Sequence, residues 1–235
     1  MVIWFRRLLD FIRLGRPLFL TGGFLFHGLG VAMALYAGAR LKVPILFWGQ
    51  IAITSIQLMT HYSNDYFDLA ADRANRTPTR WSGGSRVLPA NLLPPRVALA
   101  AAVCLAMLAL GATAVLGLWL QPQPLTIPLL LLALWLAWAY SAPPFHLHSR
   151  GLGEVTTALL VPGLTPVLGF YLQTGQLALL PFLAVAPLCC FQFNMLLSIN
   201  FPDAIGDAYA NKRTLIVRLG GEPAASLYVA VLIAA

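Results

Sequence analysis

The sequence predicts an all-α fold, a polytopic transmembrane helix bundle with six full spans and a partial seventh. Of its 235 residues, 59% are hydrophobic and only 10% are charged, whereas ordinary soluble domains carry about 25% charged residues. Apolar runs close to the length of about 20 residues that crosses a bilayer recur along the chain. Basic residues are concentrated in alternate connecting segments. We expect one membrane domain over residues 1–235.

The first element is a short helix ahead of the spans. Within residues 1–16, apolar side chains such as Trp4, Phe5 and Leu8 share the segment with Arg6 and Arg7. Basic amphipathic helices of this kind lie in the membrane surface. The segment does not have the pattern of a cleavable signal peptide.

Six apolar runs follow, and proline or glycine marks most of their ends. They are Leu18–Tyr36, Val43–Tyr62, Val97–Leu120, Leu125–Tyr140, Val155–Tyr171 and Leu177–Phe201. The last stretch, Leu227–Ala235, is too short to span a bilayer. We therefore expect a domain that is incomplete at its C-terminus, as in a truncated product.

The distribution of positive charge predicts the topology. Alternate connecting segments carry 13 Lys and Arg residues on one side and 2 on the other. Basic residues favour the cytoplasmic side, so the N-terminus is predicted to be cytoplasmic, in a bacterial inner (plasma) membrane. The net charge of +7 then reflects the membrane topology. We expect membrane lipid as a partner and no nucleic acid. The sequence carries no signal for an oligomeric state.

Two acidic clusters lie on the predicted cytoplasmic side. The segments Asn64–Asp72 and Asp203–Asp207 hold five of the eight acidic residues. Spacings of three, four and seven place Asp65, Asp68 and Asp72, or Asp203 and Asp207, on one helix face. Carboxylates beside a membrane are costly and are kept mainly for function. They could form a proton relay, a Na⁺ site or a Mg²⁺ site.

The basic segments beside the clusters favour Mg²⁺ and phosphate. Residues 73–86 contain four arginines and the Gly83-Gly84 pair, and Lys212 and Arg213 follow the second cluster. Arginine side chains and glycine amides bind phosphate oxygens, and Mg²⁺ commonly bridges carboxylates to a diphosphate. By contrast, His146 and His148 follow Pro143-Pro144 with a spacing of two, and we interpret them as polar loop residues.

Three motifs resemble the UbiA superfamily of intramembrane prenyltransferases. They are the segments NDYFDLAAD (64–72), YSAPPFHLHSRGLGE (140–154) and DAIGDAYANKRT (203–214). The resemblance extends from Arg16 to Gly220 and is strongest to the branch that uses 1,4-dihydroxy-2-naphthoate, the MenA branch. Asn211 stands where the family usually has glycine, a mild change because Asn also tolerates positive φ.

The resemblance implies roles for ten residues. One Mg²⁺ would be held by Asp65, Asp68 and Asp72 with Asn64, and a second by Asp203 and Asp207. Arg73, Lys212 and Arg213 would neutralise the diphosphate, and Tyr140 would contact substrate. Glu154, at the start of the fifth span, is either an N-terminal helix charge or a pocket residue, and the motif favours the pocket.

The implied reaction is Mg²⁺-dependent transfer of a prenyl group from a prenyl diphosphate to a lipophilic aromatic acceptor. The acceptor would be 1,4-dihydroxy-2-naphthoate in menaquinone synthesis; other family acceptors are 4-hydroxybenzoate, haem and lipid alcohols. The rival interpretation is a cation-coupled transporter that uses the same carboxylates. A transporter more usually places its charges near the bilayer midplane at broken helices.

Overall fold

The computed structural model describes residues 2–75, 78, 79 and 81–235, and all its regular elements are helical. In chain order these are α1 (Val2–Leu14), α2 (Pro17–Tyr36), α3 (Val43–Phe67), α4 (Leu69–Ala74), α5 (Pro95–Val115), η1 (Leu116–Leu120), α6 (Thr126–Ser141), η2 (His148–Arg150), α7 (Gly153–Ala158), η3 (Leu159–Leu164), α8 (Thr165–Thr174), α9 (Leu179–Tyr209), α10 (Leu215–Leu219) and α11 (Gly221–Ala234). The predicted all-α architecture is confirmed.

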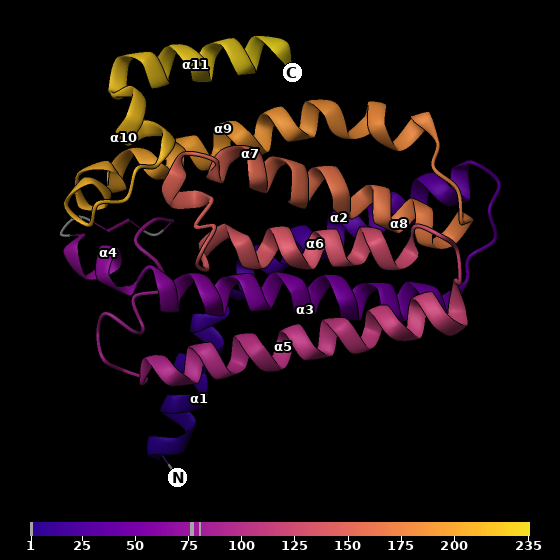
Figure 1. The fold of residues 1–235 in the computed structure, drawn as a ribbon, viewed down its shortest axis with the longest axis horizontal. Helices are drawn as coiled ribbons and strands as arrows, with labels where there is room; N and C mark the ends of the chain where they lie inside the picture. The colour runs from indigo at the N-terminus through magenta and orange to yellow at the C-terminus, as the bar shows by residue number, and fades with distance from the viewer. Residues whose placement is uncertain (1, 76–77, 80) are drawn as a thin grey trace.

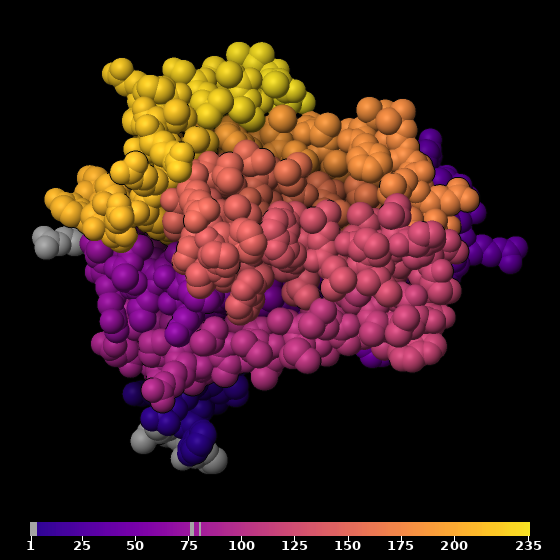
Figure 2. Space-filling view, viewed as in Figure 1, coloured from indigo at the N-terminus to yellow at the C-terminus, as the bar shows by residue number. Residues whose placement is uncertain are grey.

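The long helices lie side by side in one bundle (Figure 1). Helices α3, α5, α6 and α9 run along its length, and the short helices α4 and α10 gather at the end where α3 and α9 finish. Helix α1 crosses the bundle steeply and projects from it. Figure 2 shows α11 on the opposite side, as a ridge beyond α9. The acidic clusters therefore reach the same end of the bundle.

Within the residues that the structure describes, five helical stretches are long and apolar enough to cross a membrane. They are Pro17–Tyr36, Val43–Phe67, Pro95–Leu120, Gly153–Thr174 and Leu179–Tyr209. Helix α6, predicted as a full span, has 16 residues, or about 24 Å at 1.5 Å per residue, against a hydrocarbon core of about 30 Å. Helix α11 has 14 residues and corresponds to the predicted partial seventh span. Large apolar side chains such as Leu25, Met107 and Leu183 face outward, as expected for lipid contact.

Helices α2 and α8 meet at a glycine contact. A Cβ atom added at Gly30 would lie 2.1 Å from the backbone oxygen of Pro166 and 2.9 Å from Gly169 Cα. Small residues let membrane helices approach so closely that packing stabilises the pair. This contact holds α2 in place, and α2 begins beside Arg16, which reaches the site described below.

We expect Gly30→Ala to destabilise the bundle by about 1–3 kcal/mol, the usual cost of overpacking. Gly28 lies on the same helix, and a Cβ there would meet nothing within 4 Å, so Gly28→Ala is the matched control. Thermal or denaturant unfolding in detergent measures both variants. Equal stability of the two would contradict the assigned contact.

Candidate active site

The first acidic cluster lies where α3 gives way to α4. Asp68 is the residue between the two helices, and its amide still donates to the Asn64 carbonyl at 2.8 Å. The Asp72 amide donates in turn to the Asp68 carbonyl at 2.9 Å. Helical spacing therefore continues through the junction, so Asn64, Asp68 and Asp72 line the same pocket.

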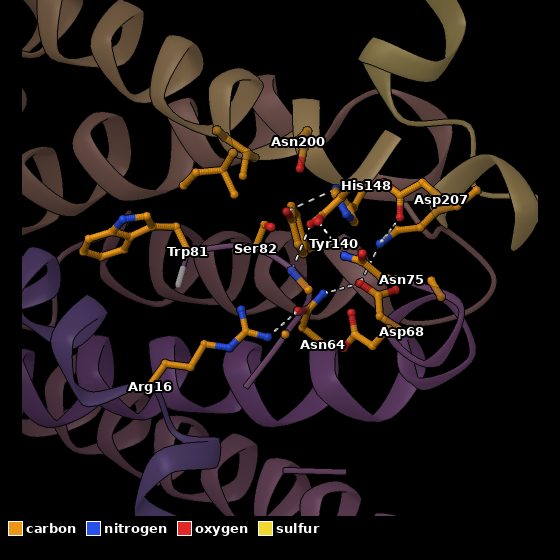
Figure 3. Close-up of a pocket in the computed structure, with 18 residues that line it drawn as sticks. Arg16, Asn64, Asp68, Asn75, Trp81, Ser82, Tyr140, His148, Asn200 and Asp207 are labelled. Atoms are coloured by element: carbon orange, nitrogen blue, oxygen red, sulfur yellow. Dashed lines mark hydrogen bonds and ion pairs between the residues drawn. The ribbon is translucent and has the colours of Figure 1, made fainter. Parts of the chain in front are cut away.

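The second cluster lies near the end of α9 and lines that same pocket. Asp203 and Asp207 are one turn apart within this 31-residue helix. The pocket is lined by Arg16, Asn64, Asp68, Ala71, Asp72, Asn75, Trp81, Ser82, Gly83, Gly84, Tyr140, His148, Leu196, Ile199, Asn200, Asp203, Asp207 and Lys212 (Figure 3). The cavity has a volume of about 80 Å³. Segment 81–84 covers the carboxylates, since the Gly83 amide donates to Asp203 and Gly84 lies against Asp72. Residues of both predicted acidic clusters thus line one pocket.

Lys212 joins the two clusters. Its ammonium lies 2.9 Å from Asp68 Oδ2 and 3.6 Å from Asp207 Oδ1. Burial opposes the charge of Lys212, but the two carboxylates raise its pKa above the ordinary value. Burial alone would likewise raise the pKa of Asp68, yet Lys212 outweighs burial and lowers it. Both groups are therefore charged at neutral pH.

Asp203 is held by the segment that follows the first cluster. Its Oδ1 accepts a hydrogen bond from Asn75 Nδ2 at 2.7 Å, and its Oδ2 accepts one from the Gly83 amide at 3.0 Å. Gly83 has φ +77, a backbone geometry that favours glycine. The chain between the clusters thus ties the second cluster to the first.

Asp72 has one carboxylate oxygen without a hydrogen-bond partner among the described residues. Its Oδ2 is buried and accepts no hydrogen bond from any described residue. Burial, together with the neighbouring charges of Asp68 and Asp65, raises the pKa of Asp72 to about 7. A cation in the pocket would satisfy this oxygen and relieve the repulsion.

Asp65 has different surroundings from the other acids of its cluster. It is fully buried, does not line the pocket, and forms an ion pair with Arg16. The Ser85 hydroxyl and amide both donate to its other oxygen. Arg16, with φ 49 just before Pro17, thereby joins the start of α2 to α3. The role of Asp65 as a metal ligand stays a prediction.

Two predicted diphosphate contacts lie away from the pocket. Arg73 donates to the Asn91 side chain at 3.0 Å at an exposed position. Arg213 is connected through its backbone amide, which donates to the Ser149 carbonyl at 2.9 Å. Neither side chain lines the pocket. Arg76 and Arg80, in the predicted phosphate-binding segment, lie outside the described residues.

Tyr140 and His148 form a stacked pair in the pocket wall. Their ring centroids are 4.9 Å apart at 16°, and the Tyr140 hydroxyl lies 3.2 Å from His148 Nδ1. Burial and the nearby Lys212 lower the pKa of His148 to about 3, so its ring is neutral. The prediction of His148 as a polar loop residue is wrong about its exposure, because the side chain is buried. Arg16, Asn75 and Asn200 also line the pocket, and no sequence motif points to them as site residues.

The donor set fits a hard divalent cation. Carboxylate and amide oxygens dominate the pocket, and Mg²⁺ prefers such ligands. Among the described residues, no three His, Cys, Asp or Glu side chains are gathered tightly enough to hold a metal. Lys212, Asn75 and the Gly83 amide engage carboxylate oxygens there. Asp68, Asp72, Asp203 and Asp207 are thus the residues that could hold Mg²⁺ after a change of partners.

Comparison with known proteins identifies the same family that the sequence motifs resemble. The model of the UbiA prenyltransferase family matches residues 24–235. The chain belongs to this family. It is 30% identical over 205 residues to a 1,4-dihydroxy-2-naphthoate octaprenyltransferase from Mycobacterium tuberculosis, covering 86% of this chain and 66% of that protein.

Other relatives differ in substrate. The chain is 31% identical over 166 residues to digeranylgeranylglyceryl phosphate synthase from Pyrococcus abyssi, covering 70% of this chain and 53% of that enzyme. A UbiA homologue from Archaeoglobus fulgidus, solved with DMAPP and Mg²⁺, has a TM-score of 0.71 at 17% identity, covering 94% of this chain and 73% of that one. The chain thus spans less than two thirds of the length of the Mycobacterium tuberculosis and Pyrococcus abyssi relatives.

The contact between segment 81–84 and Asp72 gives a test. Gly84 has φ +74, and a Cβ there would lie 2.2 Å from Asp72 Oδ2. Gly38 has φ +88 with nothing within 4 Å, so Gly38→Ala carries similar backbone strain without the contact. We expect Gly84→Ala to weaken Mn²⁺ binding about 10-fold or more, as changes around metal ligands do, and Gly38→Ala to leave it unchanged. Electron paramagnetic resonance of free Mn²⁺ measures this, and equal affinities would refute the contact's importance.

Proposed function

We propose that this protein transfers a prenyl group from a prenyl diphosphate to a lipophilic aromatic acceptor. The supporting observation is that Asp68, Asp72, Asp203 and Asp207 line one pocket with Lys212 between them. Four carboxylates around a small polar space favour a cation and its anionic ligand over an apolar substrate alone. Family membership and the relatives named as octaprenyltransferases support the same reaction.

The acidic residues would hold Mg²⁺, which when bound neutralises diphosphate charge as the C–O bond of the donor breaks. Lys212 lies beside the carboxylates and would donate to a diphosphate oxygen. The Gly83 amide faces the same space and adds a backbone donor. In this structure Lys212 pairs with Asp68 and the Gly83 amide donates to Asp203, so both donors would exchange these partners for diphosphate oxygens when the donor substrate binds.

The allylic carbon would become cationic as diphosphate departs. The Tyr140 ring, backed by His148, lines the pocket, and an aromatic face stabilises a nearby cation. Covering of the pocket by segment 81–84 would limit entry of water, which otherwise captures the cation. The acceptor ring would then form the new bond to the allylic carbon and lose a proton to the departed diphosphate.

The acceptor we propose is 1,4-dihydroxy-2-naphthoate, as in menaquinone synthesis. The relative from Mycobacterium leprae, named as an octaprenyltransferase for this acceptor, is 27% identical over 208 residues. A lipid alcohol is the second candidate, since a glyceryl phosphate synthase matches at similar identity. Assay against both acceptors with one prenyl diphosphate separates these substrates.

We propose a bacterial inner-membrane location with the pocket on the cytoplasmic side. The tally of 13 basic residues against 2 supports this orientation. Helix α1 carries exposed Trp4 and Phe5 together with Arg6 and Arg7, which fits a helix lying in the membrane surface. Labelling of single cysteines from either side of oriented vesicles tests the topology.

Replacing Asp68 or Asp203 with Ala should abolish turnover while leaving the protein folded. Each change removes a hard oxygen ligand and relieves like-charge repulsion. Diphosphate release from a prenyl diphosphate measures the loss. Asp10 pairs with Arg13 on α1, away from the pocket, so Asp10→Ala is the control. Retention of more than about a tenth of the activity, a loss of only about 1.4 kcal/mol, would refute the two-cluster mechanism.

Activity should require Mg²⁺ or Mn²⁺ and should be lost in EDTA, because oxygen ligands around a phosphate favour these ions. Na⁺ should have no effect. Diphosphate release with and without chelator is the measurement. Full activity in chelator, or Na⁺-driven uptake into vesicles, would instead support the transporter.

A further inference from the structure

Glu154 is a buried carboxylate that the proposed reaction does not yet use. It lies at the start of α7 and is 1% exposed. Its Oε1 accepts a hydrogen bond from Asn200 Nδ2 at 2.8 Å. Its Oε2 is buried without a hydrogen-bond partner among the described residues, none of which forms an ion pair with it. A buried charge with one neutral partner is costly, so a merely structural link between helices would be better served by a neutral side chain.

Asn200 connects this carboxylate to the pocket. It is 4% exposed, lines the pocket, and lies one turn before Asp203 on α9. Positions 200, 203 and 207 share a helix face. Figure 3 shows the carboxamide oxygen of Asn200 directed into the pocket. This oxygen therefore stands beside the second acidic cluster.

The chemistry of Glu154 determines which end of the Asn200 amide faces the pocket. An asparagine amide can turn by 180°, exchanging its oxygen for its NH₂ group. A carboxylate only accepts hydrogen bonds, so it selects the NH₂ group and leaves the oxygen for the pocket. A glutamine at position 154 could accept or donate, and would permit either orientation.

We infer that Glu154 is a positioning residue that fixes the Asn200 oxygen as an additional ligand for a divalent cation at Asp203 and Asp207. The inference rests on the proposed function, since it assumes that the pocket binds such a cation. A cation bound to the Asn200 oxygen would also stabilise the buried carboxylate of Glu154, which lies on the other side of the Asn200 amide. Partners of this kind outside the ligand set typically contribute 10- to 100-fold to metal affinity.

Mn²⁺ binding by the full chain in detergent tests this without requiring turnover. Electron paramagnetic resonance of free Mn²⁺, with inorganic pyrophosphate present, gives the Kd. We expect E154Q and N200A each to raise the Kd about 10-fold, and the E154Q/N200A pair to raise it no further. The control is N194A: Asn194 is a buried residue of α9 that bonds to the Tyr228 carbonyl and does not line the pocket. We expect its Kd to match the wild type.

A reversed pair gives a second, independent test. In E154Q/N200D the amide donates from position 154 and a carboxylate oxygen still faces the pocket. We expect this pair to restore the wild-type Kd or a lower one. An unchanged Kd in E154Q, effects of E154Q and N200A that multiply, or no rescue by the reversed pair would overturn the inference alone. No Mn²⁺ binding by the wild-type chain would overturn the metal-dependent function as well.

Discussion

Like charges gathered in one poorly solvated pocket are the constraint on which this structure depends. Asp68 and Asp72 come from the end of α3 and the start of α4, and Asp203 and Asp207 from α9. Their mutual repulsion opposes the approach of these helices. Lys212 offsets part of it by pairing with one carboxylate from each side. Burial, together with the charges of Asp68 and Asp65, still raises the pKa of Asp72, and a cation in the pocket would stabilise its charged form.

The helix bundle was predictable because its signals are local. A span needs about 20 apolar residues, and proline and glycine mark where most runs end. Helix α6 has 16 residues, the same number as its predicted apolar run, and is shorter than the about 20 residues that cross a bilayer. The acidic clusters were equally evident, since acids are scarce elsewhere and their spacing matches a helix face. The charge pattern predicted that both clusters lie on the same side of the membrane, and in the structure both line one pocket.

The contacts of the remaining site residues could not be predicted in this way, because each depends on a partner distant in sequence. Asp65 is adjacent to Asn64, so it projects about 100° around the helix, where it meets Arg16. Asn200 and Glu154 are 46 positions apart, and the sequence does not show that they form a hydrogen bond. In the sequence His148 lies in a polar loop, and only the structure shows that its ring stacks on Tyr140. Local pattern thus locates the carboxylates but not the residues that orient them.

Residues far from Asp203 in the sequence can affect this carboxylate through the hydrogen bonds that they donate to it. Asn75 and the Gly83 amide occupy both oxygens of that carboxylate, so these two residues fix the position of Asp203 at the end of α9. A substitution that moves either residue would displace a carboxylate more than 100 positions further along the chain. A genetic screen for lost activity would therefore group substitutions at Gly83 with those of the acidic residues themselves, although glycine carries no chemistry of its own.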